Sequence, residues 1–170
     1  MMNIDNIILI GMPGSGKTTI GKLLSKKLNY NFLDTDLLIE EKEKLTVSEI
    51  FNLKGEAYFR DCEKELIKEL INESRTVIAT GGGMPVYFDN ITQLKKSGIV
   101  IYLRVPLEEI YKRTKEGEVR PLLKHNSLNK LKEIFNQREG CYLKADLIID
   151  NYILPKEEVS DEILNIARNL

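Results

Sequence analysis

The stretch "NIILIGMPGSGKTT", residues 6–19, joins an apolar run to a glycine-rich loop, and it decides the fold. The spacing Gly11-x4-Gly16-Lys17-Thr18 is that of a P-loop, and the context agrees, because a strand pattern enters the loop and a helical pattern leaves it. Glycines let the backbone come close to a ligand, and the N–H groups of such a loop converge on oxyanions at the positive end of the following helix. The stretch therefore predicts a magnesium-nucleotide site in an α/β fold.

Two side chains of this loop carry the chemistry of the predicted site. Lys17 can reach the β- and γ-phosphates as a point charge, and the Thr18 hydroxyl can bind Mg²⁺, a hard cation that prefers oxygen ligands. The residues expected to contact ATP here are Gly14, Ser15, Gly16, Lys17, Thr18 and Thr19. Mg²⁺ is thus the expected cofactor, and the acceptor of the phosphate has to be sought elsewhere in the chain.

Outward from the loop, short apolar runs alternate with helical patterns. Strands are expected at 6–10, 30–36, 76–80, 98–103 and 145–150, and helices at 18–28, from about Asp36 to Glu73, and at 155–170. Within the long helical region, Thr46 and Glu49 form a capping-box pattern, and Gly55 is expected to divide the region into two helices. Apolar strands between helices favour a buried parallel sheet in a layered α/β fold of one domain, 1–170. Two segments are expected to be functional insertions, at about 34–73 and about 113–125.

Composition excludes several classes of protein. The chain has 170 residues, 42% of them apolar and 30% charged, which is typical of a globular protein, and its net charge of −1 does not suggest nucleic-acid binding. No apolar run is long enough for a membrane span, and the N-terminus lacks a signal pattern, so we expect a cytoplasmic protein. Cys62 and Cys141 suit a reducing compartment and lack metal-site spacing, and the single histidine, His125, is interpreted as a bystander.

Absent motifs narrow the kinds of P-loop protein. A guanine-reading segment would need an acid where "TKEG" (114–117) has Gly117, and no Asp-x-x-Gly segment occurs. A motor-type ATPase usually has an apolar strand ending in Asp-Glu, but "LIID" (147–150) is followed by Asn151. Nucleoside-monophosphate kinases place an arginine soon after the second strand, whereas "DTDLLIEEK" (34–42) has none. These absences favour a kinase for a small hydroxylated metabolite.

The segment "DTD" (34–36) lies at the carboxyl end of a predicted strand, which is the edge where α/β sheets bind ligands. Asp34 and Asp36 are two residues apart, so in extended backbone both side chains project to the same side. One can serve Mg²⁺ through its waters, and the other can accept a hydrogen bond from a sugar-like hydroxyl. The alternative, for Asp36 taken alone, is that this aspartate at the strand end only caps the next helix.

Two arginines are candidates for binding an anionic group. "GEAYFRDCE" (55–63) places Arg60 and Glu63 three apart on one helical face, so the glutamate can hold the arginine ready to clamp a carboxylate. A solvated surface pair is the alternative reading. "NQREGCY" (136–142) offers Arg138 as a second contact for a carboxylate or phosphate.

Two glycine-containing segments complete the candidate site. Gly81, Gly82 and Gly83 follow a buried strand, where three glycines indicate a close approach of ligand and backbone amides that can hold a hydroxyl. "RTKEGEVRPLL" (113–123) is polar, contains Gly117, and is interpreted as a lid that brings an arginine, Arg113 or Arg120, to the phosphoryl group. A plain loop remains the alternative for each segment.

Taken together, these motifs resemble the shikimate kinase family over nearly the whole chain. The matching segments, in order, are "GMPGSGKTT" (11–19), "DTD" (34–36), "GEAYFRDCE" (55–63), "TGGG" (80–83), "RPLL" (120–123), "QREGCY" (137–142) and "IIDNYILP" (148–155). The resemblance implies a three-layer P-loop kinase fold with a five-stranded parallel sheet, a helical substrate-binding insert and a short lid. It also implies transfer of the γ-phosphate of ATP to the 3-hydroxyl of shikimate, in the pathway to chorismate and the aromatic amino acids.

The resemblance assigns roles residue by residue. Lys17, Asp36 and Arg120 would be catalytic, Thr18 would bind Mg²⁺ directly and Asp34 through water, and Arg113 and Pro155 would flank adenine. Shikimate would be bound by Asp36, Arg60, Gly81, Gly82, Gly83 and Arg138. Segment 150–155 departs from the Asn and Arg spacing of many family members, so the contacts to the base stay open. The expected partners are ATP and shikimate, with no nucleic acid and no membrane, for a monomer.

Two other functions remain open from the sequence. One is a kinase for another small hydroxy acid such as gluconate, against which the pair Arg60 and Arg138 argues, as does the lack of a His-Pro pair after "DTD" (34–36). The other is a nucleotide-sensing relative without turnover, against which the presence of Lys17, Asp36 and Arg120 argues.

Overall fold

The five predicted strands form one parallel sheet. The computed structural model describes residues 6–116 and 128–168. The strands are β1 Asn6–Ile10, β2 Asn31–Asp34, β3 Thr76–Ala79, β4 Ile99–Arg104 and β5 Leu147–Asp150. Their order is β2-β3-β1-β4-β5, and every neighbouring pair runs parallel, with Ile8 opposite Ile78 on one side and Val100 on the other. The prediction of a five-stranded parallel sheet is confirmed.

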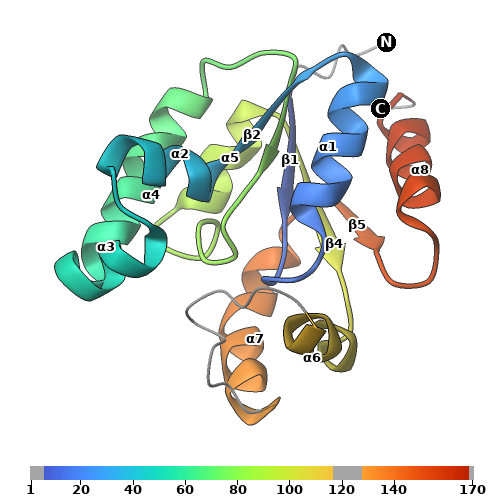
Figure 1. Cartoon of the computed structure of the whole chain (residues 1–170). Coiled ribbons are helices and arrows are strands. Elements are labelled where there is room, and N and C mark those ends of the chain that lie inside the picture. The colour runs from blue at the N-terminus through green and yellow to red at the C-terminus, as the bar shows by residue number, and fades with distance from the viewer. Residues whose placement is uncertain (1–5, 117–127, 169–170) are drawn as a thin grey trace.

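Helices cover both faces of this sheet. They are α1 Lys17–Leu28, α2 Thr35–Glu43, α3 Val47–Lys54, α4 Glu56–Leu70, α5 Asn90–Ser97, α6 Leu107–Glu116, α7 Leu128–Tyr142 and α8 Lys156–Arg168. Figure 1 shows α1 and α8 on one face, α4 and α5 on the other, and α6 and α7 beyond the carboxyl ends of the strands. The three-layer α/β architecture predicted from the alternation is therefore confirmed.

The central strand β1 is buried on both faces, which explains its uninterrupted apolar sequence. Ile7 and Leu9 pack in a cluster with buried residues of α1 and α8, and Ile8 and Ile10 pack in a second cluster with residues of α4 and α5. Successive side chains of a strand point to opposite faces, so a strand covered on both sides needs apolar residues at every position.

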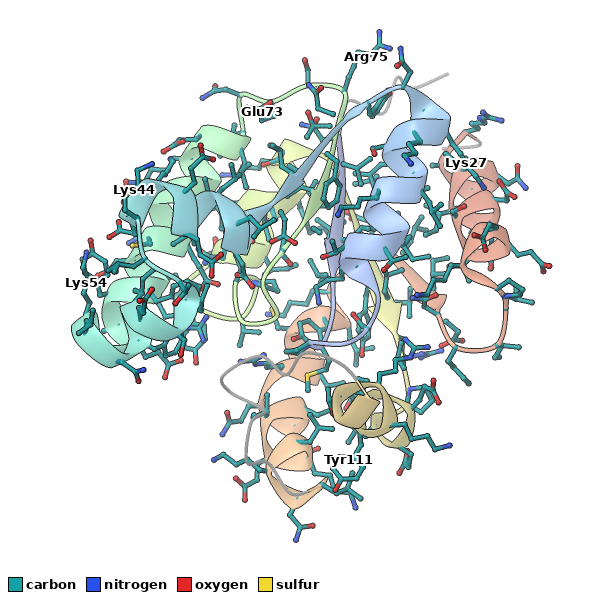
Figure 2. The ribbon with its side chains drawn as sticks, in the orientation of Figure 1. Lys27, Lys44, Lys54, Glu73, Arg75 and Tyr111 are labelled. Atoms are coloured by element: carbon teal, nitrogen blue, oxygen red, sulfur yellow. The ribbon has the colours of Figure 1, made fainter. Side chains whose placement is uncertain are left out.

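The helix after the P-loop is anchored against the last helix of the chain. Lys27 of α1, labelled in Figure 2, donates from Nζ to the Ser160 hydroxyl and the Asp161 carboxylate of α8, at 2.6 Å each. Buried leucine and isoleucine side chains of both helices share one apolar cluster. Helix α1 is thereby fixed against α8 along its apolar face and at its carboxyl end.

The helical insert differs from the prediction, because it contains three helices rather than two. Lys44 adopts a left-handed conformation (φ 56°) that ends α2, and Gly55 (φ 86°) separates α3 from α4. The predicted capping box is confirmed, since the Thr46 hydroxyl accepts from the Glu49 amide and the Glu49 carboxylate accepts from the Thr46 amide. That box is itself the start of a helix, so it already indicated the additional break.

The second strand is shorter than expected and ends at Asp34 instead of residue 36. The Asp34 carboxylate accepts from the amides of Asp36 and Leu37, at 3.1 and 3.4 Å, and so caps α2. Asp36 therefore lies in the first turn of a helix, and the extended-backbone argument for the pair was wrong. The sequence analysis had raised the capping alternative for Asp36, whereas the structure gives the cap to Asp34, whose other carboxylate oxygen accepts from the Thr18 hydroxyl.

The predicted lid, about 113–125, lies largely outside the described residues. Arg120 and His125 belong to the segment 117–127 that the structure does not describe, whereas Arg113 lies on α6. None of the helices in the described ranges combines the length and the apolar character that a membrane span requires.

Candidate active site

Three segments from separate parts of the chain meet beyond the carboxyl ends of the strands. The P-loop follows β1, the start of α2 follows β2, and Gly81 to Gly83 follow β3. Because these three strands are neighbours in a parallel sheet, their carboxyl ends lie side by side at the edge where α/β folds bind ligands.

The P-loop holds its lysine in place before any ligand arrives. Lys17 is only 5% exposed, and its Nζ donates to the carbonyls of Gly11 and Met12 at 2.9 Å each and to the Ser15 hydroxyl at 3.4 Å. Helix α1 has Gly16 as its N-cap and no side chain capping it, so its first amides form an anion site at the positive end of the helix. The loop thus presents an ammonium group and a helix terminus together, as predicted.

A side-chain hydroxyl and a carboxylate are paired beside the P-loop. The Thr18 hydroxyl donates to Oδ2 of Asp34 across 2.9 Å, which joins the first turn of α1 to the end of β2. A hydroxyl and a carboxylate next to a phosphate site are the hard oxygen donors that suit Mg²⁺. The residues present therefore fit the metal that the sequence implied.

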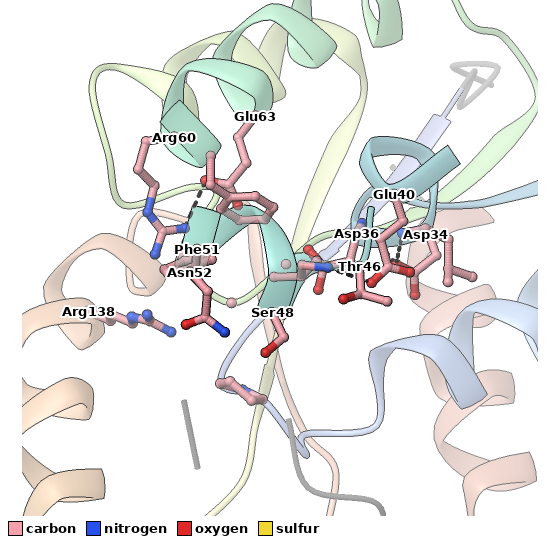
Figure 3. A pocket seen from close by; sticks show the side chains of 17 residues that line it. Asp34, Asp36, Glu40, Thr46, Ser48, Phe51, Asn52, Arg60, Glu63 and Arg138 are labelled. Atoms are coloured by element: carbon pink, nitrogen blue, oxygen red, sulfur yellow. Dashed lines mark hydrogen bonds and ion pairs between the residues drawn. The ribbon is translucent and has the colours of Figure 1, made fainter. Parts of the chain in front are cut away.

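A pocket of about 650 Å³ opens between the P-loop and the helical insert. Its size is that of a site for a small molecule. Figure 3 shows Asp36 on one side of it, and Arg60, Glu63 and Arg138 on another. The lining residues that the sequence predicted are Asp34, Asp36, Arg60, Gly81, Gly82, Gly83 and Arg138.

Arg60 is buried and oriented by two glutamates. It is 4% exposed, its Nη1 donates to Glu63 at 2.9 Å, and its Nη2 and Nε donate to Glu56 at 2.9 and 3.2 Å. The Tyr87 ring lies 4.1 Å from the guanidinium carbon. The predicted pair with Glu63 is present. Glu56, four residues before Arg60, had a readable spacing and was missed, whereas Tyr87 follows a distant strand and left no local signal.

Glu63 is a buried carboxylate under opposing influences. Burial raises its pKa to about 7, the Arg60 guanidinium opposes that rise, and the Asp36 carboxylate adds to it. One of its oxygens, Oε1, is buried without a hydrogen-bond partner among the described residues. The charges of Arg60 and Asp36 thus act in opposite directions on the pKa of Glu63 in the pocket wall.

Each of the three consecutive glycines makes room for one polar side chain of the pocket. A Cβ at Gly81 would lie 2.5 Å from Asp36 Oδ1, and one at Gly83 would lie 2.5 Å from Arg60 Nη1. One at Gly82 would lie 3.0 Å from Arg138 Nη1 and also 2.9 Å from the Pro13 ring. The sequence analysis expected ligand approach and amide donors at these positions. The backbone N–H of Gly81 instead donates to the Thr35 hydroxyl, at 2.9 Å.

The glycine segment is also anchored from α7. Tyr142 is fully buried, and its hydroxyl donates to the Gly82 carbonyl at 2.6 Å. Arg138 lies one turn earlier on the same helix and is 7% exposed. Helix α7 therefore positions the glycine segment and one arginine of the pocket together. Neither Tyr142 nor Thr35 was singled out from the sequence.

Arg113 lies at the outer edge of the P-loop. Its Nη1 donates to the Gly14 carbonyl at 3.3 Å, its Nη2 to the Asn151 carbonyl at 3.1 Å, and its Nε to Glu109 at 3.1 Å. Pro155, its predicted partner beside adenine, is exposed in the connection between β5 and α8.

The site combines a buried P-loop lysine, a hydroxyl and a carboxylate that suit a metal, and a pocket walled by buried arginines. This combination is typical of a P-loop phosphotransferase that acts on a small molecule. The family model described as shikimate kinase matches residues 13–168. The chain belongs to the shikimate kinase family.

Individual relatives agree with this family. A shikimate kinase of Clostridium botulinum is 52% identical over 150 residues, which are 87% of this chain and 88% of that protein. One of Persephonella marina is 41% identical over 163 residues, covering 96% and 99% of the two chains. A solved structure of shikimate kinase from Acinetobacter baumannii, in complex with shikimate, has a TM-score of 0.92 at 35% identity and covers 98% of this chain and 94% of its own.

Replacement of Gly83 by alanine tests the packing argument. The added methyl group would displace Arg60, which is buried between Glu56 and Glu63 and has little room to yield. We expect Gly83→Ala to raise KM for shikimate about tenfold, because small displacements of positioning groups are costly. Steady-state kinetics with each substrate varied in turn would measure it, and KM for ATP should stay near the wild-type value.

The matched control is Gly140→Ala on α7, where an added Cβ meets nothing within 4 Å. It should leave both KM values unchanged. An unchanged KM for shikimate in Gly83→Ala would mean that Arg60 does not depend on the bare glycine face.

Proposed function

We propose that this protein transfers the γ-phosphoryl group of ATP to the 3-hydroxyl of shikimate through the residues that line the pocket beside the P-loop. The observation that carries the assignment of the residues is the arrangement of Asp36, Arg138 and Arg60 against three successive glycines. It combines cationic groups for a carboxylate with an acid for a hydroxyl. Shikimate carries both groups on one ring.

The arginines bind the carboxylate in this proposal. Glu56 and Glu63 each engage Arg60, yet each terminal nitrogen of its guanidinium keeps a further N–H group. A planar fork held in this way can bind a carboxylate through parallel hydrogen bonds. Arg138 approaches the same side of the pocket from α7 (Figure 3) and supplies a second cation.

The remaining residues align and neutralise the reacting groups. Lys17 balances charge that spreads over the phosphoryl oxygens, and Asp36 orients the acceptor hydroxyl and takes its proton. Thr18 would hold Mg²⁺ directly and Asp34 through water, and the metal would supply further charge neutralisation when bound. Arg113 and Pro155 flank adenine, and Gly14, Ser15, Gly16 and Thr19 complete the ATP site. Arg120, outside the described residues, is the lid arginine of this proposal.

We propose that the protein works as a monomer. The described residues that line the pocket extend from the P-loop to α7. Its ATP substrate and its two isolated cysteines, Cys62 and Cys141, fit a cytoplasmic location.

A coupled assay of ADP release tests the proposal. The unmodified protein with MgATP is offered shikimate, gluconate and nucleoside monophosphates in turn, and turnover should appear with shikimate. Arg60→Lys keeps a charge but loses the planar fork, so KM for shikimate should rise at least about tenfold while KM for ATP changes little. Arg75→Lys is the matched control, because Arg75 lies over the Tyr30 ring beyond the other end of the sheet.

Three results would contradict the proposal. Turnover with gluconate and not with shikimate would make the protein a different small-acid kinase. ADP binding without turnover on any acceptor would make it a nucleotide sensor. Equal losses for both substrates in Arg60→Lys would place that arginine outside the carboxylate site.

A further inference from the structure

The carbonyl groups of the P-loop need partners of their own. In a loop whose amides turn inward to phosphate, carbonyls turn outward and must be satisfied by other groups. The Gly14 carbonyl accepts from Arg113, and the Ser15 carbonyl accepts from Nδ2 of Asn151 at 2.7 Å. Arg113 and Asn151 are far from the P-loop in the sequence but lie directly against it in the structure.

Asn151 is held rigidly where it makes this contact. It follows β5 directly and is 2% exposed, and its backbone N–H donates to the Arg104 carbonyl at 3.0 Å. Its own carbonyl accepts from Arg113. The side-chain amide is therefore fixed at a buried position by main-chain contacts on both sides.

The side chain of Asn151 also fills the space beside Gly16. Gly16 has φ +92°, and a Cβ there would lie 2.6 Å from Nδ2 of Asn151. Gly16 is the N-cap of α1 and directly precedes Lys17. The Asn151 amide thus packs against the point where the loop becomes the anion-binding end of the helix.

The peptide bond between Ser15 and Gly16 connects the two contacts of the Asn151 side chain. The carbonyl of Ser15 and the amide N–H of Gly16 belong to one planar, trans peptide unit, so they point in opposite directions. A partner that fixes the carbonyl outward also fixes that N–H inward, toward the phosphates. Removal of the partner leaves this peptide unit free to rotate.

We infer that Asn151 is a positioning residue of the nucleotide site, which sets the orientation of the Ser15–Gly16 peptide through its side chain and of Arg113 through its carbonyl. The inference rests on the proposed function only in taking the P-loop as the nucleotide site. It links the phosphate side of that site to the residue expected beside the base.

The substitution Asn151→Asp tests the inference with almost no change of shape. A carboxylate cannot donate to the Ser15 carbonyl and places an acceptor against it. We expect the Kd for MgADP, measured by calorimetry without any acceptor, to rise about tenfold, the size expected when a buried hydrogen bond becomes an unfavourable contact. The Kd for shikimate, titrated separately, should stay close to the wild-type value.

Asn6→Asp is the matched control for stability. Asn6 is also a buried asparagine, 1% exposed, and its Nδ2 donates to the carbonyls of Glu73 and Ser97 at the opposite end of the sheet. Both variants should lower Tm, and only the Asn151 variant should weaken MgADP binding. If Asn151→Asp fails to fold, Asn151→Ser, which shortens the polar group, should give a smaller loss of the same kind.

Unchanged MgADP affinity in a folded Asn151 variant, or an equal loss in Asn6→Asp, would overturn the inference and leave Asn151 a structural residue. The result is independent of the acceptor, because no phosphoryl transfer is measured. Failure of the unmodified protein to phosphorylate shikimate would contradict the proposed function without affecting this titration.

Discussion

Replacement of Lys17 by alanine is expected to reduce shikimate-dependent ADP release about a thousandfold, the upper range for loss of one preorganised group that stabilises the transition state. The carbonyls of Gly11 and Met12 already hold its ammonium at 2.9 Å, inside a site where the side chain is 5% exposed. A charge held in this way needs little reorganisation during the reaction and is weakly screened by water. The coupled assay under saturating MgATP measures the loss.

Two further variants make the result interpretable. Lys26→Ala removes an exposed lysine from the same helix and should leave turnover unchanged. Lys17→Met keeps most of the side-chain volume, so it separates the loss of charge from a collapse of the loop. Turnover within a few-fold of wild type in both Lys17 variants would show that another group neutralises the phosphoryl charge.

The fold could be predicted because its signals are local. The apolar sequence of β1, the glycine spacing of the P-loop and the helical pattern after it lie within residues 6–28, and each reflects backbone geometry over a few residues. The other strands were found as apolar runs between helical patterns, because a parallel strand covered on both faces needs an apolar run. The same locality explains the capping box at Thr46 and the pairing of Arg60 with Glu63.

The predictions failed where a local pattern had more than one solution. "DTD" (34–36) suits an extended strand end or a helix start, and the capping of α2 by Asp34 decided for the helix. The long insert was expected to break once, at Gly55, although Lys44 ends a helix of its own. The left-handed conformation of Lys44 leaves no reliable signal in a single sequence, so the capping box at Thr46 was the sign of this break and was not used.

The contacts that support the site could not be predicted because their partners are distant in the chain. Asn151 meets the P-loop, Tyr142 meets Gly82, and Tyr87 meets Arg60 only after the sheet has brought these segments together. The glycines at 81–83 were interpreted as ligand-contacting, and the structure shows that they leave space for polar side chains from α2, α4 and α7. Such complementarity is a property of the packed site and not of the segment.

Asp36→Asn is expected to lower kcat with shikimate at least about a hundredfold, the lower range for loss of a general base, while MgADP binds as in the wild type. The amide keeps the shape that fits against Gly81, where Asp36 Oδ1 occupies the place of a side chain. It loses the anion that, in the proposed function, orients the hydroxyl and accepts its proton. Single-turnover measurements with bound ATP and shikimate would separate this chemical step from binding.

The electrostatics of the pocket supply an independent check on the same variant. Asp36 raises the pKa of Glu63, so its replacement by asparagine should lower that pKa from about 7, as followed by carbon-13 NMR of the carboxyl group. Asp61→Asn, an exposed acid beside Arg60 on the same helix α4, should alter neither kcat nor the Glu63 titration. A lowered Glu63 pKa with normal turnover would show that Asp36 lies in the pocket without taking part in the transfer. If turnover is lost because the anion is removed, kcat and the Glu63 pKa should both fall in Asp36→Asn. Neither should change in Asp61→Asn.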